Sequence, residues 1–161
     1  MNALMIYYSF EGNTDYVASK FKEYLDIDTE RLTVMNEPPK KGLGKFLHGG
    51  KSALRKEDPR MNALQADVQA YDTILIAFPV WAGTCPPAID MCLKTYPFKD
   101  KNVYIIATSA SGNAKKAMIN VTEMMAGNLI VDTLSLTSPL KNKEKTDAQI
   151  QEFCQKITGR L

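Results

Sequence analysis

Residues 3–21 read ALMIYYSFEGNTDYVASKF, and the hydrophobic pattern changes its period within this stretch. The first part, Ala3–Tyr8, is an almost continuous apolar run, which is typical of a strand covered on both faces of a sheet. Further on, Val17, Phe21 and Leu25 recur at every fourth position, which predicts a helix with one apolar face. The residues between are mostly small and polar and include no lysine or arginine. The stretch therefore predicts a parallel strand, a polar turn and an amphipathic helix.

The same alternation continues along the chain. Apolar runs at Thr73–Pro79 and Val103–Thr108 predict two more buried strands, and weaker strands are expected near Ile27–Val34 and Leu129–Leu136. Three further helical stripes consist of Ile89, Leu93 and Tyr96; of Met118, Val121, Met124 and Met125; and of Ile150, Phe153, Cys154 and Ile157. Five strands interleaved with helices predict an α/β fold, a doubly wound five-stranded parallel sheet in a three-layer α/β/α sandwich.

Two helix starts carry local signals. Pro86 and Pro87 suit the first turn of the helix that precedes Tyr96, because proline needs no N–H partner there. Thr146 and Gln149 have the spacing of a capping box. This spacing predicts that the last helix begins at Thr146.

Composition limits the class of protein. A chain of 161 residues is long enough for one domain with a core of ordinary size, so we expect a single domain over residues 1–161. With 45% hydrophobic and 24% charged residues, the chain reads as globular rather than disordered. The formal net charge of +2 is too small to predict a nucleic-acid or membrane partner, and no apolar run approaches the roughly 20 residues of a membrane span. We therefore expect a cytoplasmic protein that binds neither.

The three cysteines, Cys85, Cys92 and Cys154, are odd in number and fit no metal-binding spacing. A disulfide scaffold and a zinc site are both disfavoured on these grounds. We expect the three thiols to be buried small hydrophobic groups.

One basic segment does not fit the alternation. Residues Glu37 to Met61 read EPPKKGLGKFLHGGKSALRKEDPRM and contain five lysines, two arginines and the only histidine, His48. A solvated excursion with a short helix is the favoured interpretation, and a basic binding patch or a lid is the alternative. His48 is expected at the surface rather than in catalysis, because no serine or cysteine with an activating context accompanies it.

Polar loops follow three of the predicted strands: SFEGNT at 9–14, PVWAGT at 79–84 and SASGN at 109–113. The carboxyl ends of parallel strands meet at one edge of the sheet, where ligands bind in such folds. The first loop opens a helix, whose unpaired N–H groups and dipole attract an anion, above all a phosphate. Trp81, the only tryptophan, lies in the second loop and indicates either a loop anchor or an aromatic ligand.

These loops resemble those of a known family. SFEGNT is similar to the phosphate loop of the flavodoxins, usually written S/T-x-T-G-x-T, and PVWAGTCPPAI and TSASGN resemble their two flavin-ring loops. The loops follow the first, third and fourth predicted strands, in the order that the family shows. The resemblance implies FMN as cofactor and a strand order of 2-1-3-4-5.

The resemblance also implies which residues bind FMN. The phosphate loop would comprise Ser9, Phe10, Glu11, Gly12, Asn13 and Thr14. The second loop, with Trp81 against the flavin ring, would comprise Pro79, Val80, Trp81, Ala82, Gly83 and Thr84. The third loop would comprise Ser109, Ala110, Ser111, Gly112 and Asn113. Glu11 stands where the family has a hydroxyl residue, so we expect its carboxylate to face solvent or to cap the helix.

Two functions remain open. An FMN-binding electron-transfer protein is favoured, with a redox partner protein or a small-molecule electron donor or acceptor as its partner. The third loop has no aromatic residue and the chain is slightly basic, which favours the alternative, an NAD(P)H-dependent FMN or quinone oxidoreductase. A flavin-free receiver module is disfavoured, because Tyr8-Ser9 and Phe78-Pro79 place no aspartate at the strand ends. Whether the chain forms a homodimer is left open.

Overall fold

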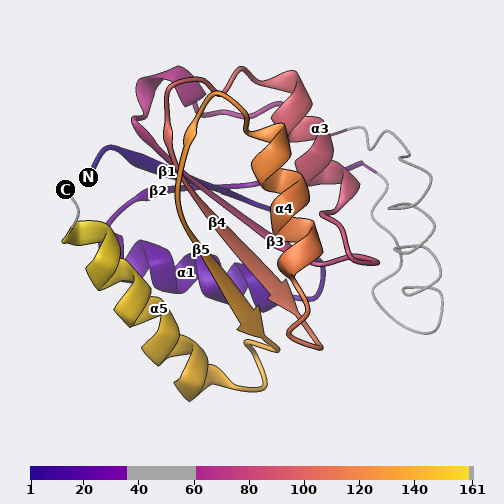
Figure 1. The fold of residues 1–161 in the computed structure, drawn as a ribbon, viewed down its shortest axis with the longest axis vertical. Coiled ribbons are helices and arrows are strands. Elements are labelled where there is room, and N and C mark those ends of the chain that lie inside the picture. The colour runs from indigo at the N-terminus through magenta and orange to yellow at the C-terminus, as the bar shows by residue number, and fades with distance from the viewer. Residues whose placement is uncertain (36–60, 160–161) are drawn as a thin grey trace.

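The three apolar runs form the central strands of one parallel sheet in a computed structural model, which describes residues 1–35 and 61–159. The strands are β1 (Ala3–Tyr7), β2 (Asp28–Arg31), β3 (Thr73–Pro79), β4 (Asn102–Ser109) and β5 (Leu129–Thr137). Their order is β2-β1-β3-β4-β5 with every neighbouring pair parallel (Figure 1). The predicted doubly wound sheet and its strand order are therefore confirmed. The order reverses between β1 and β3, where a crevice opens at the carboxyl edge of such sheets.

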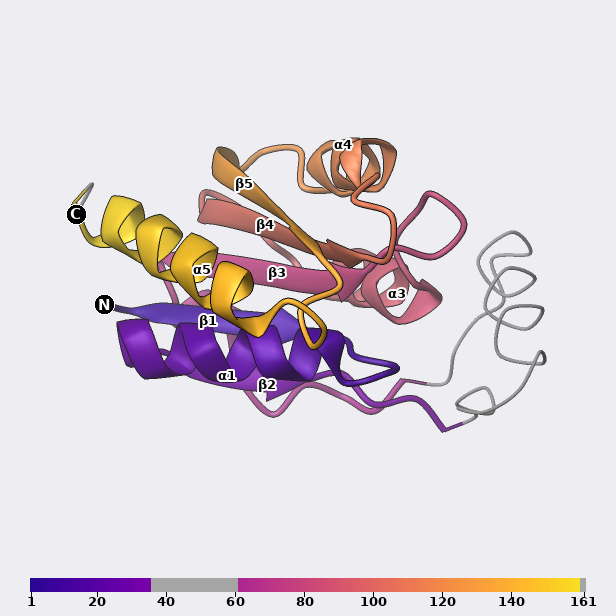
Figure 2. The same cartoon turned by 90° about the horizontal axis from the view of Figure 1, so that it is seen from below.

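Four α-helices of the described residues cover the two faces of this sheet. They are α1 (Asn13–Leu25), α3 (Pro87–Thr95), α4 (Lys115–Met124) and α5 (Lys143–Thr158), and a short 3₁₀ helix η1 spans Val68–Ala70. Helices α1 and α5 lie side by side on one face, and α3 and α4 lie on the other (Figure 2). The three-layer arrangement follows from the central strands β1, β3 and β4, which are buried on both sides and need cover on both.

Each layer of helices encloses its own core. Leu4 and Ile6 of β1 point toward α3 and α4, whereas Ala3 and Met5 point toward α1 and α5. On the second side Phe21 makes an edge-to-face contact with Phe153, with 6.1 Å between the ring centroids. The period-2 alternation of the strands thus distributes one continuous apolar run over two separate cores.

Two element boundaries differ from the sequence prediction by three residues. Helix α5 begins at Lys143 rather than at Thr146, whose side chain is buried in the helix and whose N–H donates to the carbonyl of Asn142. The predicted capping box is therefore wrong, because the fold buries Thr146 and starts the helix one turn earlier. Strand β2 ends at Arg31, and Val34 instead forms an isolated antiparallel bridge with Met61.

The predicted basic segment at 37–61, including His48, lies outside the described residues except for Met61. The described residues that flank it are joined to each other. The N–H of Asn62 donates to the carbonyl of Thr33 at 3.0 Å, and the Glu30 carboxylate accepts the N–H groups of Gln65 at 2.5 Å and Ala66 at 2.8 Å. The two flanks of residues 36–60 therefore emerge side by side next to β2.

All three cysteines are buried and unpaired, as predicted. Burial raises the pKa of the Cys85 thiol to about 11 and the pKa values of Cys92 and Cys154 to about 12. A thiolate in a low-dielectric interior is disfavoured, so these groups stay protonated at neutral pH.

These raised pKa values predict a loss of stability in alkali. An unfolded thiol releases its proton near pH 8.5, whereas the native thiols keep theirs until about pH 11–12. The unfolded state therefore binds fewer protons above pH 9, and the free energy of unfolding falls as the pH rises from 9 to 11. Urea titrations at several pH values measure this. In Cys92→Ala the fall should be smaller by about 1 kcal/mol per pH unit, and equal slopes in both proteins would contradict the prediction.

Candidate functional site

A cavity of about 600 Å³ opens at the carboxyl edge of the sheet, where β1, β3 and β4 end. The loops after these strands and the loop after β5 form its walls. Its lining residues are Ser9, Phe10, Glu11, Asn13, Thr14, Pro79, Val80, Trp81, Ala82, Thr108, Ser109, Ala110, Ser138, Leu140 and Lys141. The volume lies in the range that is typical of cofactor and small-ligand sites.

The first wall is the turn into α1. Gly12 precedes the helix with a φ of +88°, a conformation that favours glycine, and as the N-cap residue it has no side chain to offer the helix N–H groups. The N–H groups of Asn13 and Thr14 have no hydrogen-bond partner within residues 1–35 and 61–159. Only the third N–H of the helix, that of Asp15, is used, and it donates to Ser9 Oγ at 3.1 Å. The turn thus presents two unpaired donors and a helix dipole to the cavity, which is the arrangement that binds anions.

Two of the predicted hydroxyl groups also hold the turn together. The Thr14 and Thr108 hydroxyl oxygens lie 3.1 Å apart and share one hydrogen bond, which joins the start of α1 to the end of β4. Ser9 is buried, and its oxygen already accepts from Asp15. A ligand can therefore use the hydrogen of the Ser9 hydroxyl and one hydrogen of the threonine pair.

Arg31 stabilises the turn from the neighbouring strand β2, although the turn itself contains no cationic residue. Arg31, at the end of β2, donates from Nη2 to the carbonyl of Ser9 and from Nε to the Asp15 carboxylate, both at 2.8 Å. These bonds hold both ends of the turn, because Ser9 begins it and Asp15 lies in the first turn of α1. Nothing in the local sequence signals this contact, since Arg31 follows Asp15 by 16 residues.

Glu11 is exposed, as the sequence analysis expected, although it contributes to the cavity rim. Its carboxylate can remain hydrated there. The exposure limits the repulsion that an anion in the cavity would experience.

The second wall contains Trp81. Its indole packs edge-to-face on Tyr8 and Phe10, with centroid distances of 5.7 and 5.5 Å. The same side chain is partly exposed and lines the cavity. The indole therefore anchors the loop, and its place in the cavity lining leaves the prediction of an aromatic ligand compatible with that role.

The Trp81 loop is a tight turn that requires special backbone angles. Trp81 and Thr84 exchange two N–H···O bonds of 2.9 Å. Between them Ala82 has a φ of +48° and Gly83 a φ of +79°, which is the pattern of a type I′ turn. This turn fixes the position from which Trp81 projects.

We expect Gly83→Ala to lower the free energy of unfolding by about 1 kcal/mol, because a Cβ at positive φ is strained. The nearest heavy atom to the new Cβ would be Lys116 Cδ at 3.9 Å, so a clash does not contribute. Gly83→Asn should lower the free energy of unfolding by less than Gly83→Ala does, since asparagine tolerates the left-handed region. Urea unfolding of the two variants measures the difference, and equal losses would contradict a backbone origin.

The third wall is formed by Ser109 and Ala110. The Ser109 hydroxyl oxygen is buried and has no hydrogen-bond partner in the part of the chain that the structure describes. An unpaired buried hydroxyl is costly and is expected where a ligand completes the bonding. The rest of this loop, Ser111, Gly112 and Asn113, is exposed and does not line the cavity.

The cavity and the predicted site coincide in part. The predicted residues outside the lining are Gly12, Gly83, Thr84, Ser111, Gly112 and Asn113. The lining residues that sequence analysis missed are Thr108, Ser138, Leu140 and Lys141. The last three follow β5, and a general signal for them existed, because the carboxyl end of every parallel strand reaches the same edge.

Metal-binding clusters and membrane-spanning helices are both absent from the described residues, 1–35 and 61–159. These residues contain no group of three or more His, Cys, Asp or Glu side chains that could hold a metal ion. None of their helices is long and apolar enough to cross a membrane.

Comparison with known families decides the relationship of the chain. A family model described as flavodoxin matches residues 2–157. The chain belongs to the flavodoxin family. This family assignment agrees with the strand order and with the three loops at the carboxyl edge, and the resemblance seen in the sequence is confirmed. A comparison with curated proteins gave no match.

Solved structures of flavodoxins and related proteins share the fold. A flavoprotein from Lactobacillus acidophilus, solved in complex with FMN, is 24% identical with a TM-score of 0.71, over 87% of this chain and 96% of its own. Oxidised flavodoxin 2 from Bacillus cereus is 17% identical with a TM-score of 0.64, over the full length of both chains. The apo form of an NADH:FMN oxidoreductase is 12% identical with a TM-score of 0.55, over 97% of this chain and 90% of its own.

Proposed function

We propose that this member of the flavodoxin family binds FMN in the cavity at the carboxyl edge of the sheet. The observation that carries the proposal is the pair of unpaired N–H groups at Asn13 and Thr14, which open into the same cavity as the exposed part of Trp81. A phosphate group suits the first feature and a flat aromatic ring suits the second. The FMN in the similar flavoprotein from Lactobacillus acidophilus supports the same assignment.

The donors and walls of the cavity fit FMN. The phosphate would accept from the N–H groups of Asn13 and Thr14 and from the Ser9 hydroxyl, and Arg31 would keep this turn in shape. The unpaired Ser109 hydroxyl would meet a polar atom of the cofactor. These residues are proposed as the binding site, together with the Trp81 loop.

Electron transfer to and from a redox partner is the function that we propose for the bound cofactor. When bound, FMN supplies one- and two-electron chemistry, and the protein sets the environment in which it occurs. The chain would contribute a rigid site, since the cavity walls are turns closed by hydrogen bonds at the ends of buried strands.

One observation favours a second candidate, an NAD(P)H-dependent FMN or quinone oxidoreductase. The third loop offers only Ser109 and Ala110 to the cavity, and no aromatic side chain of this loop closes it. A small-molecule donor or acceptor would therefore find space beside the cofactor. The fold of the NADH:FMN oxidoreductase is similar, but its low identity leaves the choice between the two functions to experiment. Turnover of NAD(P)H with a quinone by the purified protein alone would identify a reductase, and its absence would identify a carrier.

The binding proposal predicts a yellow protein that releases FMN on heating. Flavin fluorescence should be quenched in the holoprotein by Trp81 and should increase at least severalfold in Trp81→Ala. Tyr24→Ala is the control, because Tyr24 lies on α1 outside the cavity lining. A purified protein that binds no FMN at micromolar concentration would contradict the proposal, and an unchanged emission in Trp81→Ala would remove Trp81 from the site.

A further inference from the structure

The loop after β5, residues 138–141, is a wall of the cavity that the three flavin-binding loops of the sequence do not include. We propose that this β5–α5 loop completes the phosphate end of the site and that Lys141 supplies its cation. The proposal rests on the proposed function, since it concerns how the same cavity holds the phosphate of FMN. It predicts that the site distinguishes phosphorylated from unphosphorylated flavins partly through Lys141.

Contacts place the β5–α5 loop directly against the anion-binding turn. The N–H of Leu140 donates to Asn13 Oδ1 at 3.1 Å, and a Cβ built on Gly12 would lie 3.6 Å from Leu140 Cδ1. Asn13 carries one of the two unpaired N–H groups at the start of α1. Lys141 follows Leu140 and lines the same cavity, so the proposal puts its ammonium group at the phosphate end.

Hydrogen bonds hold the loop in a backbone conformation that is energetically unfavourable at Ser138. Ser138 has a φ of +46°, which is unfavourable for a residue with a Cβ by about 1 kcal/mol. Its N–H donates to the carbonyl of Ser109 and its carbonyl accepts the N–H of Lys141, both at 2.9 Å. The Asn142 side chain closes the loop by donating to the carbonyl of Thr137 at 3.1 Å. Strained residues of this kind concentrate at binding sites, and here the strained residue itself lines the cavity.

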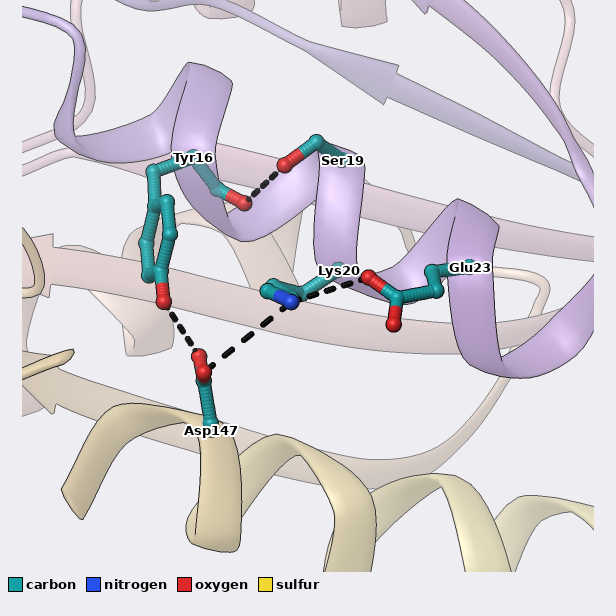
Figure 3. A network of polar contacts seen from close by, with 5 residues as sticks. All are labelled: Tyr16, Ser19, Lys20, Glu23 and Asp147. Carbon is teal, nitrogen blue, oxygen red and sulfur yellow. Dashed lines mark hydrogen bonds and ion pairs between the residues drawn. The ribbon is translucent and has the colours of Figure 1, made fainter. Parts of the chain in front are cut away.

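Helix α5 begins directly after the loop and is fixed to α1. Figure 3 shows Asp147 of α5 between two side chains of α1, where it accepts a hydrogen bond from the Tyr16 hydroxyl at 2.5 Å and lies 4.0 Å from Lys20 Nζ. Lys143 Nζ lies 5.4 Å from the centroid of the Tyr16 ring. The same helix, α1, thus positions both the unpaired N–H groups and the start of α5.

Lys141 is the one cationic side chain among the described residues that line the cavity. It is exposed, and its ammonium group has no hydrogen bond or ion pair with the residues that the structure describes. The neighbouring cations are arranged differently: Lys143 lies over the Tyr16 ring, and Arg31 is bonded to Ser9 and Asp15. An unpaired ammonium on a residue that lines the same cavity as two unpaired N–H groups is suited to neutralise a dianion.

Lys141→Gln tests the proposal by titration of the apoprotein with FMN and with riboflavin. The Kd for FMN should rise about fivefold, since an exposed ion pair contributes modestly, and the Kd for riboflavin should not change. In 0.5 M NaCl the rise in the Kd for FMN should be smaller. Lys141→Glu should raise this Kd more than Lys141→Gln does. Lys145→Gln is the matched control, because Lys145 is exposed on α5 and does not line the cavity.

The outcomes separate this inference from the proposed function. If the unmodified protein binds neither flavin, the proposed function fails. If it binds FMN and Lys141→Gln binds FMN equally well, only the role of Lys141 fails. An equal loss for FMN and riboflavin would show that Lys141 acts through the shape of the loop rather than through its charge, and would also overturn the inference.

Discussion

Asn13→Asp is expected to weaken FMN binding by about 100-fold without lowering the stability of the protein. The substitution places a carboxylate at the first residue of α1, beside the N–H groups that we propose for the phosphate. A single charge and a dianion within about 5–6 Å of each other near a protein surface repel by a few kcal/mol. An acidic residue in the first helical turn is itself favourable by about 0.3–1 kcal/mol, and the new Oδ1 still accepts the N–H of Leu140.

Fluorescence titrations with FMN and riboflavin, together with thermal unfolding of the apoprotein, measure both effects. Riboflavin has no phosphate, so its affinity should change little. Asn120→Asp adds the same charge on α4, outside the cavity lining, and should leave both affinities within about twofold. If Asn13→Asp binds FMN as tightly as the unmodified protein, the phosphate does not lie at the start of α1.

Phe21→Ala is expected to have the largest effect on stability, a loss of about 3–5 kcal/mol in the free energy of unfolding. Phe21 is fully buried between α1 and the sheet and contacts the ring of Phe153. Phe153 in turn contacts Tyr104 of β4, at 5.9 Å between centroids. Removing the first ring leaves a cavity that the rigid strands cannot close, and such a loss is a large part of the 5–15 kcal/mol typical of a domain.

Urea unfolding measures this loss. Ile119→Ala is the control, since Ile119 is 47% exposed on α4 and should change the stability by no more than about 0.5 kcal/mol. FMN affinity of folded Phe21→Ala should stay within a few-fold, because Phe21 does not line the cavity. A loss below about 1 kcal/mol would contradict the packing role of the ring.

Much of the fold could be predicted from local pattern. The run Ala3–Tyr8 reads as a strand covered on both faces, and the stripe of Val17, Phe21 and Leu25 reads as one helix face, because both periods are properties of neighbouring residues. The start of α5 shows the limit of this reasoning. Thr146 and Gln149 have capping-box spacing, but burial of Thr146 against the core outweighed that local signal.

Part of the predicted site lines the cavity. The turn at 9–14 and the Trp81 loop both reach the cavity, because each follows a strand that was recognisable in the sequence. Ser111, Gly112 and Asn113 are exposed and do not line it, and the local sequence does not show where along a loop the lining stops. The resemblance to flavodoxins supplied the chemistry of the ligand, which the turn alone left open.

By itself, the sequence determined the alternation of strands and helices, the polar loops after three strands and the membership of the flavodoxin family. Tertiary structure alone decided which distant side chains support those loops. Arg31 reaches Ser9 because β2 pairs with β1, and the loop that carries Lys141 lines the cavity next to the start of α1, to which Leu140 is bonded through Asn13. Contacts of this kind depend on how strands pair and helices pack, and no period or spacing within a short segment encodes them.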